Sequence, residues 1–232
     1  MTTAIQLRLE RPEFNVEVAL RLEGAVALVG RSGSGKSSII RALAGLEPAA
    51  RGSIPRLEVG YLGQRDGLFP HMTALDNVAF PLKATGVRKR HACASARESL
   101  AALGLSAAVD RRPGELSGGQ RRRVALARAL APGRELYLLD EPFAGLDLDS
   151  ATLAEKFIAE RISGSDAPCL IAGHDVPRLR RICSSILRVE RGRIAPTAHA
   201  INGSTEPLRV RAPVRALQSS GDMPWDCREG SR

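Results

Sequence analysis

Short apolar runs ended by glycine, proline or a polar residue are the most regular pattern along this chain. The clearest are AVALV at 25–29, VGYLG at 59–63, LYLL at 136–139 and CLIAG at 169–173. Runs of this length and composition are typical of strands buried on both faces of a parallel sheet. Ligands of open α/β sheets bind just beyond the carboxyl ends of the strands. The residues that directly follow these runs are therefore the first candidates for a functional site.

The N-terminal segment shows a different pattern, in which apolar and polar residues alternate. One set on a single face is Ile5, Leu7 and Leu9, and a second set is Phe14, Val16, Val18, Leu20 and Leu22. Alternation of this kind predicts strands with one buried face. We expect the two segments to form an antiparallel β unit packed beside the parallel core.

The apolar period becomes helical after Gln64. Residues 73–86 begin with a threonine and carry an acidic residue three positions later, as capped helices do. Residues 88–105 place one apolar set on a single helical face. That set is Ala92, Ala96, Leu100 and Leu103. We therefore predict a helical subdomain, inserted into the sheet-forming sequence at about residues 72–131.

The run at 25–29 leads directly into GRSGSGKS at residues 30–37. This sequence fits the phosphate-loop (Walker A) pattern G-x-x-x-x-G-K-[ST], whose glycines let backbone N–H groups face a polyphosphate. Lys36 would add a positive charge near the outer phosphates, and the hydroxyl of Ser37 can reach a magnesium ion. The next segment, SSIIRALAGL, predicts a helix whose N-terminus faces the same anion. The alternative is a flexible Gly/Ser linker, which the flanking strand and helix disfavour.

Polar residues follow the other three runs as well. Asp140 and Glu141 follow LYLL, where Asp140 would hold magnesium and Glu141 would orient and deprotonate an attacking water. His174 follows CLIAG and would contact a γ-phosphate, and Gln64 follows VGYLG. Taken singly, the two carboxylates also fit a solvated turn, and the histidine also fits a structural role. The phosphate loop upstream favours the functional interpretation of the whole set.

Residues 115–130, ELSGGQRRRVALARAL, predict a helix with Ser117 as its N-cap. A Ser–Gly–Gly start leaves backbone N–H groups and a hydroxyl free, so it can form a second anion site. The alternative is an ordinary capped helix on the surface.

The ordered set of motifs resembles that of the ATP-binding cassette (ABC) ATPases. The set is GRSGSGKS, Gln64, LSGGQ at 116–120, YLLDEP at 137–142, AGLD at 144–147 and His174. The resemblance covers roughly residues 20–195. It implies an α/β fold of the P-loop NTPase (RecA-like) class, with a parallel sheet core, an N-terminal antiparallel β subdomain and an inserted helical subdomain. We expect residues 1–195 to form this domain and residues 196–232 to form a poorly ordered tail.

The resemblance also implies a composite ATP site. Two cassettes would face each other head to tail, in a homodimer, with each ATP between the phosphate loop of one and the LSGGQ segment of the other. The implied catalytic residues are Glu141, His174, Gln64 and Lys36. The implied nucleotide-binding residues are Gly30, Arg31, Ser32, Gly33, Ser34, Gly35, Lys36, Ser37, Ser38, Ser117, Gly118, Gly119 and Gln120. Mg²⁺ would be bound by Ser37, Gln64 and Asp140, and Asp147 would cross the dimer seam.

Composition narrows the possible partners. The formal net charge of +9 fits nucleic acid, an anionic membrane surface or an arginine-rich proteome, but aromatic residues make up only 3% of the chain, too few for base-stacking platforms. We therefore expect no nucleic acid partner. No apolar stretch reaches the roughly 18 residues of a membrane-spanning helix. Cys93, Cys169, Cys183 and Cys227 lack metal-ligand or disulfide spacing and are interpreted as reduced thiols.

The predicted function is that of an ATPase subunit that powers a separate integral membrane permease. The segments QRDGLFPHMTALDNVAFPL and LLDEPFAGLD are similar to those of importers of small solutes or anions, with molybdate-type and thiamine-type cassettes nearest. Leu68, Phe69 and Pro70 would contribute either to a cleft for the permease or to ordinary packing. We expect a cytoplasmic protein, peripheral on the inner face of the membrane, that works indirectly with a solute-binding protein. The alternatives are an exporter subunit and a soluble ABC ATPase acting on nucleic acid or ribosomes.

Two features depart from the pattern of the family. Phe14 is predicted to lie inside a strand, which leaves no clear aromatic residue to stack on adenine. The link from Gly52 to Gly60 is short, so the β-hairpin usual at this point is expected to be reduced.

Overall fold

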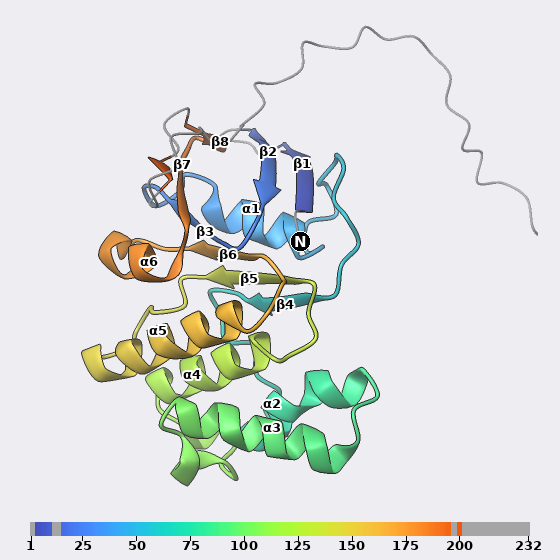
Figure 1. Ribbon diagram of the computed structural model, residues 1–232, viewed down its shortest axis with the longest axis vertical. Coiled ribbons are helices and arrows are strands. Elements are labelled where there is room, and N and C mark those ends of the chain that lie inside the picture. Colours follow the sequence, from blue (N-terminus) through green and yellow to red (C-terminus); the bar gives the residue numbers. More distant parts are fainter. Residues whose placement is uncertain (1–2, 11–14, 196–198, 201–232) are drawn as a thin grey trace, which may run out of the picture.

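One twisted sheet runs through the molecule, which we describe from a computed structural model for residues 3–10, 15–195 and 199–200 (Figure 1). Its strands are β1 (Thr3–Leu9), β2 (Val16–Leu22), β3 (Ala25–Val29), β4 (Val59–Leu62), β5 (Leu136–Asp140), β6 (Cys169–Ala172), β7 (Ser185–Glu190), β8 (Arg193–Ile194) and β9 (His199–Ala200). Their order across the sheet is β1-β2-β8-β7-β3-β6-β5-β4, and β9 pairs with β7.

The sheet has a parallel part and an antiparallel part. Strands β7, β3, β6, β5 and β4 are parallel neighbours, whereas β1 and β2 are antiparallel with Ile5 opposite Leu20. The predicted fold class is confirmed, including the antiparallel unit at the N-terminus. β2 begins at Val16, and Phe14 lies outside the described residues.

Helices cover both faces of the parallel part. They are α1 (Lys36–Leu43), α2 (Ala74–Ala84), α3 (Lys89–Ala102), α4 (Gly118–Ala129), α5 (Leu148–Ser163) and α6 (Val176–Ile182), with single 3-10 turns at Ser106–Ala108 and Pro113–Glu115. None of the helices in these described segments is long and apolar enough to cross a membrane.

Two hydrophobic cores lie on opposite faces of the sheet because successive strand residues point to opposite sides. In β3, Val26 and Leu28 pack with α1 and with the antiparallel strands. Ala25 and Ala27 pack into the other core, which also holds the buried faces of α2 to α6. Figure 1 shows α1 between the parallel strands and β1–β2, with α2, α3, α4 and α5 beyond the opposite face.

The inserted helices form as the sequence predicts. Thr73 caps α2 by accepting a hydrogen bond from the Asp76 amide at 3.1 Å. The predicted apolar face of α3 is buried, with Ala92, Ala96 and Leu100 each 0% exposed. Between α1 and β4 the described chain contains no strand apart from a single bridge from Arg51 to Arg8, in agreement with the short link predicted there. Of the predicted tail, β9 pairs with β7, and residues 196–198 and 201–232 lie outside the described part.

Candidate nucleotide-binding site

Four neighbouring strands bring the predicted site together. The carboxyl ends of β3, β6, β5 and β4 lie side by side, with Leu28 opposite Ala172, Asp140 opposite Ala172 and Leu62 opposite Leu139. The phosphate loop therefore leaves the sheet beside His174, Asp140–Glu141 and Gln64. The parallel arrangement that the apolar runs predicted is what places these segments at one edge.

The phosphate loop is fixed against β7 and the turn that follows it. A Cβ atom on Gly30 would lie 2.3 Å from the carbonyl oxygen of Val189, so only glycine allows this approach. The amide of Gly192 donates to the carbonyl oxygen of Ser34 at 2.7 Å. At the end of the loop Gly35, with φ of 105°, is the N-cap of α1 and supplies no side-chain hydrogen bond to it. The first amides of α1 are thus left for an anion.

Lys36 lies inside the loop rather than in solvent. It is 5% exposed, and its Nζ donates to the carbonyl oxygens of Gly30 at 2.8 Å and Arg31 at 3.2 Å. Burial lowers the pKa of Lys36, while the nearby carboxylates of Glu141 and Asp140 oppose that shift. Ser37 and Ser38 lie in the first turn of α1 and are half-buried, whereas Arg31, Ser32 and Gly33 are exposed at the outer side of the loop.

Asp140, Ser37 and Gln64 form a group of polar side chains at the ends of β5 and β4. Nε2 of Gln64 donates to Oγ of Ser37 at 2.9 Å, so this amide presents its nitrogen to the serine. Asp140 is 1% exposed, and its Oδ1 is buried without a hydrogen-bond partner. Burial raises the pKa of Asp140, and Ser37, Arg122 and Lys36 act in the opposite direction.

This group fits a magnesium ion. A buried carboxylate oxygen without a partner is costly unless another group satisfies it. A hydroxyl and a second carbonyl-bearing side chain lie beside it, and hard oxygen donors of this kind suit Mg²⁺.

Glu141 and His174 meet across the ends of β5 and β6. Nε2 of His174 lies 3.0 Å from Oε1 of Glu141. Glu141 has a positive φ of 53°, a strained conformation for a residue with a side chain, and strain of this kind is frequent at functional sites. Its amide donates to the carbonyl oxygen of Ala172 at 2.9 Å, which ties the strained residue to β6. Burial raises the pKa of Glu141, whereas His174 and Lys36 lower it.

The LSGGQ segment lies apart from this cluster in the same chain. Ser117 caps α4 by accepting from the Gln120 amide at 3.2 Å, and the Gln120 side chain accepts from the Ser117 amide at 2.9 Å. Ser117 and Gly118 are exposed. Within the described segments, no hydrogen bond or ion pair joins residues 117–120 to the phosphate loop. Asp147 caps α5 through the amide of Ser150 at 2.8 Å.

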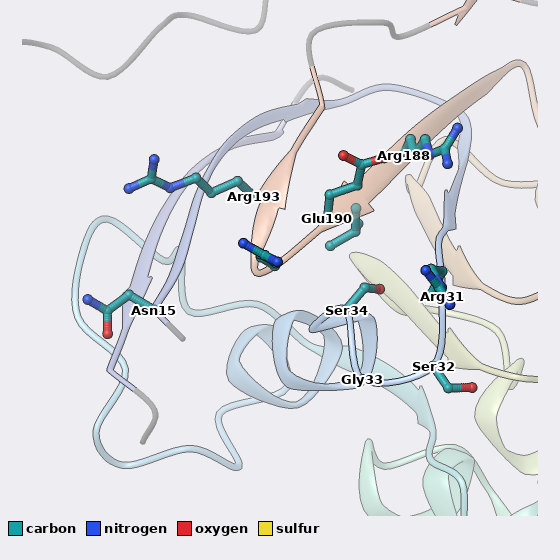
Figure 2. A pocket seen from close by; sticks show the side chains of 10 residues that line it. Asn15, Arg31, Ser32, Gly33, Ser34, Arg188, Glu190 and Arg193 are labelled. Atoms are coloured by element: carbon teal, nitrogen blue, oxygen red, sulfur yellow. Dashed lines mark ion pairs between the residues drawn. The ribbon is translucent and has the colours of Figure 1, made fainter. Parts of the chain in front are cut away.

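A hollow of about 1050 Å³ borders the outer side of the phosphate loop (Figure 2). It is lined by the loop, by Asn15 before β2, and by the arginines Arg188, Arg191 and Arg193 of β7, β8 and their turn. Glu190 is the acidic residue in this lining and pairs with Arg188 at 2.8 Å. The surface beside the loop therefore carries an excess of positive charge.

Sequence reasoning missed two groups of residues at the site. The arginines of the hollow carry no sequence signal, because they reach the phosphate loop only through the pairing of β7 with β3. Arg122 is buried behind Asp140 and Glu141. Its position could have been found, because Arg122, Ala125, Leu126 and Ala129 have the spacing of one helical face.

Comparison with known proteins agrees with this geometry. The ABC transporter family profile matches residues 14–144. The molybdenum import ATP-binding protein ModC of Thiobacillus denitrificans is 34% identical over 235 residues, covering 93% of this chain and 63% of that protein. The lipoprotein-releasing system ATP-binding protein LolD of Chromohalobacter salexigens is 35% identical over 201 residues, covering 79% and 84%. This chain thus spans less than two thirds of its ModC relative.

A solved structure shows the same fold. The dimeric ATP-binding cassette MJ0796 bound to ADP and Pi superimposes with a TM-score of 0.74 at 23% identity, over 88% of this chain and all of that chain. The profile match and the 35% identity to LolD, together with the four motif-bearing strand ends, show that this chain belongs to the ABC transporter family of ATP-binding cassettes, a family that hydrolyses ATP.

Proposed function

We propose that this chain binds and hydrolyses ATP and couples the reaction to transport by a separate membrane permease. The observation that supports this most strongly is the convergence of the phosphate loop, Gln64, Asp140–Glu141 and His174 at the ends of four adjacent strands. In this proposal residues 1–195 are the ATPase domain, with the helical subdomain inserted at about 72–131.

The triphosphate is held by the loop and by the start of α1. Backbone amides of residues 33 and 35–38 donate to the phosphates, and Lys36 places its ammonium group against the outer ones. The nucleoside lies along the hollow beside Arg31, where the neighbouring arginines add positive charge close to the α-phosphate.

Glu141 accepts a proton from the attacking water as the water oxygen bonds to the γ-phosphorus and the bond to the β–γ bridging oxygen breaks. His174 orients the Glu141 carboxylate through the 3.0 Å contact and faces the γ-phosphate. Gln64 follows β4, on the other side of Glu141 from His174, and orients the attacking water.

Ser37, Gln64 and Asp140 would hold Mg²⁺, with the unpartnered Oδ1 of Asp140 as its buried ligand. The ion, when bound, would neutralise charge on the β- and γ-phosphates.

A second copy of the chain completes the site. Ser117, Gly118, Gly119 and Gln120 form the start of α4, where Ser117 and Gly118 are exposed. Within the described residues, no hydrogen bond or ion pair joins this segment to the phosphate loop of the same chain. A triphosphate concentrates negative charge, so a second helix N-terminus closing over it from a partner stabilises the ATP-bound dimer. Hydrolysis removes that link and lets the two copies separate, an order–disorder switch.

The transport partner is an integral membrane permease, with a solute-binding protein acting through it, and the chain lies on the cytoplasmic side of the membrane. Import of a small solute or anion is supported by the identity to ModC. The surface after Gln64 fits contact with a permease, because the ring of Phe69 packs at a tilt against that of Phe80, with 4.9 Å between the ring centres, and Phe80 is 40% exposed. Nucleic acid has no part in this function.

Export is the second candidate, because LolD of Chromohalobacter salexigens is as similar to this chain as ModC is. The two are separated by transport direction in proteoliposomes that contain the chain with the permease that co-purifies with it. ATP-dependent loss of solute from the side that holds the binding protein supports import, and ATP-dependent release of lipid or lipoprotein supports export. Mg²⁺-dependent phosphate release by the purified chain tests the ATPase step, and its absence from both the free chain and the permease complex would refute it.

A further inference from the structure

Arg122 is a buried cation that contacts two segments of the site, the Gln64 loop and the Asp140–Glu141 turn, and is not among the residues assigned to catalysis above. Arg122 as a whole is 4% exposed. Nη1 donates to the carbonyl oxygen of Gly63 at 2.7 Å and to Oδ1 of Asp66 at 3.3 Å. Nη2 donates to the carbonyl oxygens of Asp140 at 2.6 Å and Glu141 at 2.8 Å.

Three of these four acceptors are backbone carbonyl oxygens of, or next to, the residues proposed to act in hydrolysis. Gly63 directly precedes Gln64, and the other two carbonyls belong to the magnesium ligand and the proposed base themselves. The planar guanidinium offers a fixed fork of donors, so it sets the distance between the end of β4 and the end of β5. A lysine could supply the charge but not four directed contacts.

Arg122 also belongs to α4, the helix that Ser117 caps. The start of α4 is the part of the chain that closes on the partner's nucleotide in the proposed dimer. The same helix therefore carries both the segment for the neighbouring ATP and the contact to this chain's own Gln64 loop and Glu141.

We propose that Arg122 is a positioning residue. It keeps the Gln64 loop and the Asp140–Glu141 turn in a fixed position relative to each other and to the start of α4. The inference rests on the proposed function. It predicts that Arg122 acts through Gln64 and Glu141, on the hydrolysis step, and that it leaves nucleotide binding by the phosphate loop unchanged.

The electrostatics of the site support this role. Arg122 is among the groups that hold down the pKa of Asp140 and of Glu141 against the effect of burial. Its Nε is buried without a hydrogen-bond partner, which costs free energy of desolvation. A purely space-filling residue at this point of the core would avoid that cost.

Arg134 supplies a matched control. Its side chain is 9% exposed, close to the 5% of the Arg122 side chain, and it too joins separate segments. Arg134 contacts Glu58 at 2.8 Å and the carbonyl oxygen of Pro81 at 3.2 Å. Arg134 and Glu58 precede β5 and β4, so this contact lies at the amino ends of the strands and not at the carboxyl ends that form the site. Equal substitutions at the two positions separate an effect on catalysis from the loss of any buried arginine.

The test compares Arg122→Lys, Arg122→Gln, Arg134→Lys and Arg134→Gln in the full chain, by steady-state ATP hydrolysis, ATP affinity and thermal melting. We expect kcat to fall roughly 10- to 100-fold in both Arg122 variants, since small displacements of reacting groups have effects of that order. ATP affinity should stay within about threefold, and the Arg134 variants should keep the wild-type kcat. Equal kcat values at the two positions, or a loss of ATP affinity that accounts for the change, would overturn the proposal.

A double-mutant cycle with Gln64→Ala tests whether Arg122 acts through the Gln64 loop. We expect the loss in kcat from Arg122→Lys to shrink severalfold in the Gln64→Ala background, whereas additive effects would contradict the coupling. Asp66→Asn, which changes a partner side chain that is 25% exposed, replaces Arg122→Lys if that variant does not fold. It should then show a smaller loss with the same non-additivity. Failure of the proposed function is separate, because it would show as absence of hydrolysis in the unsubstituted chain.

Discussion

His174 and Glu141 face each other across the ends of two neighbouring parallel strands, with Nε2 of the histidine 3.0 Å from Oε1 of the glutamate. The two residues are far apart in the sequence and are brought together by the pairing of β5 with β6. The backbone of Glu141 is strained and burial raises the pKa of its carboxyl group. The first two predictions concern Glu141.

Glu141→Gln should reduce kcat for ATP hydrolysis by about 10²- to 10⁴-fold, because an amide cannot accept the proton of the attacking water. ATP affinity should be retained, since Lys36 and the loop amides are untouched. Phosphate release and equilibrium binding of a fluorescent ATP analogue measure the two effects. Glu160→Gln, on α5 in an exposed ion pair with Lys156, is the control and should behave as wild type. Wild-type turnover in Glu141→Gln would remove this residue from its proposed role.

Glu141→Gln should also stabilise the nucleotide-free protein at neutral and alkaline pH. Burial raises the pKa of Glu141, so between the ordinary value of about 4 and the raised value the folded state binds more protons than the unfolded state. Stability therefore falls as the pH rises through this window, and the ionised glutamate is a cost at all higher pH. The melting temperature of the variant should exceed that of wild type at pH 8, and the difference should vanish near pH 4.

An acid limb in the pH dependence of kcat follows from the same shift. Activity should be lost as the pH falls through the raised pKa of Glu141, at a higher pH than an ordinary glutamate would give. His174→Ala should move this limb further upward, because His174 lowers the pKa of Glu141. His91→Ala, an exposed residue of α3, is the matched control. An identical limb in His174→Ala and wild type would show that the contact does not tune the carboxylate.

Gly30→Ala should weaken ATP binding at least tenfold and destabilise the fold by about 1–3 kcal/mol, since overpacking of a close contact has that cost. The added Cβ would lie 2.3 Å from the carbonyl oxygen of Val189, so the loop or β7 must move. Gly114→Ala is the control, because no atom outside its own neighbours lies within 4 Å of the added Cβ. Isothermal titration and chemical denaturation measure both quantities, and an unchanged ATP affinity would show that the loop tolerates the shift.

The sequence predicts the central strands well because each is a short apolar run between turn-forming residues. The run at 25–29 matches β3 at both ends, and β5 extends one residue further, through Asp140. Thr73 and Ser117 were predicted as caps because their side-chain oxygens precede helical patterns, and both accept the expected amide hydrogen bonds. The two-residue strands β8 and β9 have no such signal, since only pairing with other strands defines them, β8 with β7 and β2 and β9 with β7.

Only part of the site could be predicted from the sequence, because some of its residues are placed by tertiary contacts that leave no local pattern. Gln64, Glu141 and His174 each follow a recognisable strand, so their convergence could be expected from the sheet alone. Arg122 lies within three consecutive arginines, and local sequence does not separate the buried one from its half-buried neighbours unless the helical face is traced. The arginines around the hollow depend on how the β7–β8 turn folds back on the phosphate loop, which is a tertiary contact.

The claim that two copies share each ATP is tested most directly by the molar mass of the hydrolysis-impaired Glu141→Gln chain in ATP and Mg²⁺, determined by light scattering after size exclusion. We expect twice the monomer mass with ATP and the monomer mass without it. Adding Ser117→Arg should leave a monomer that still binds ATP, because the exposed start of α4 can no longer close on the partner's nucleotide. An ATP-dependent dimer that survives Ser117→Arg, or a Glu141→Gln chain that encloses ATP as a monomer, would contradict the composite site.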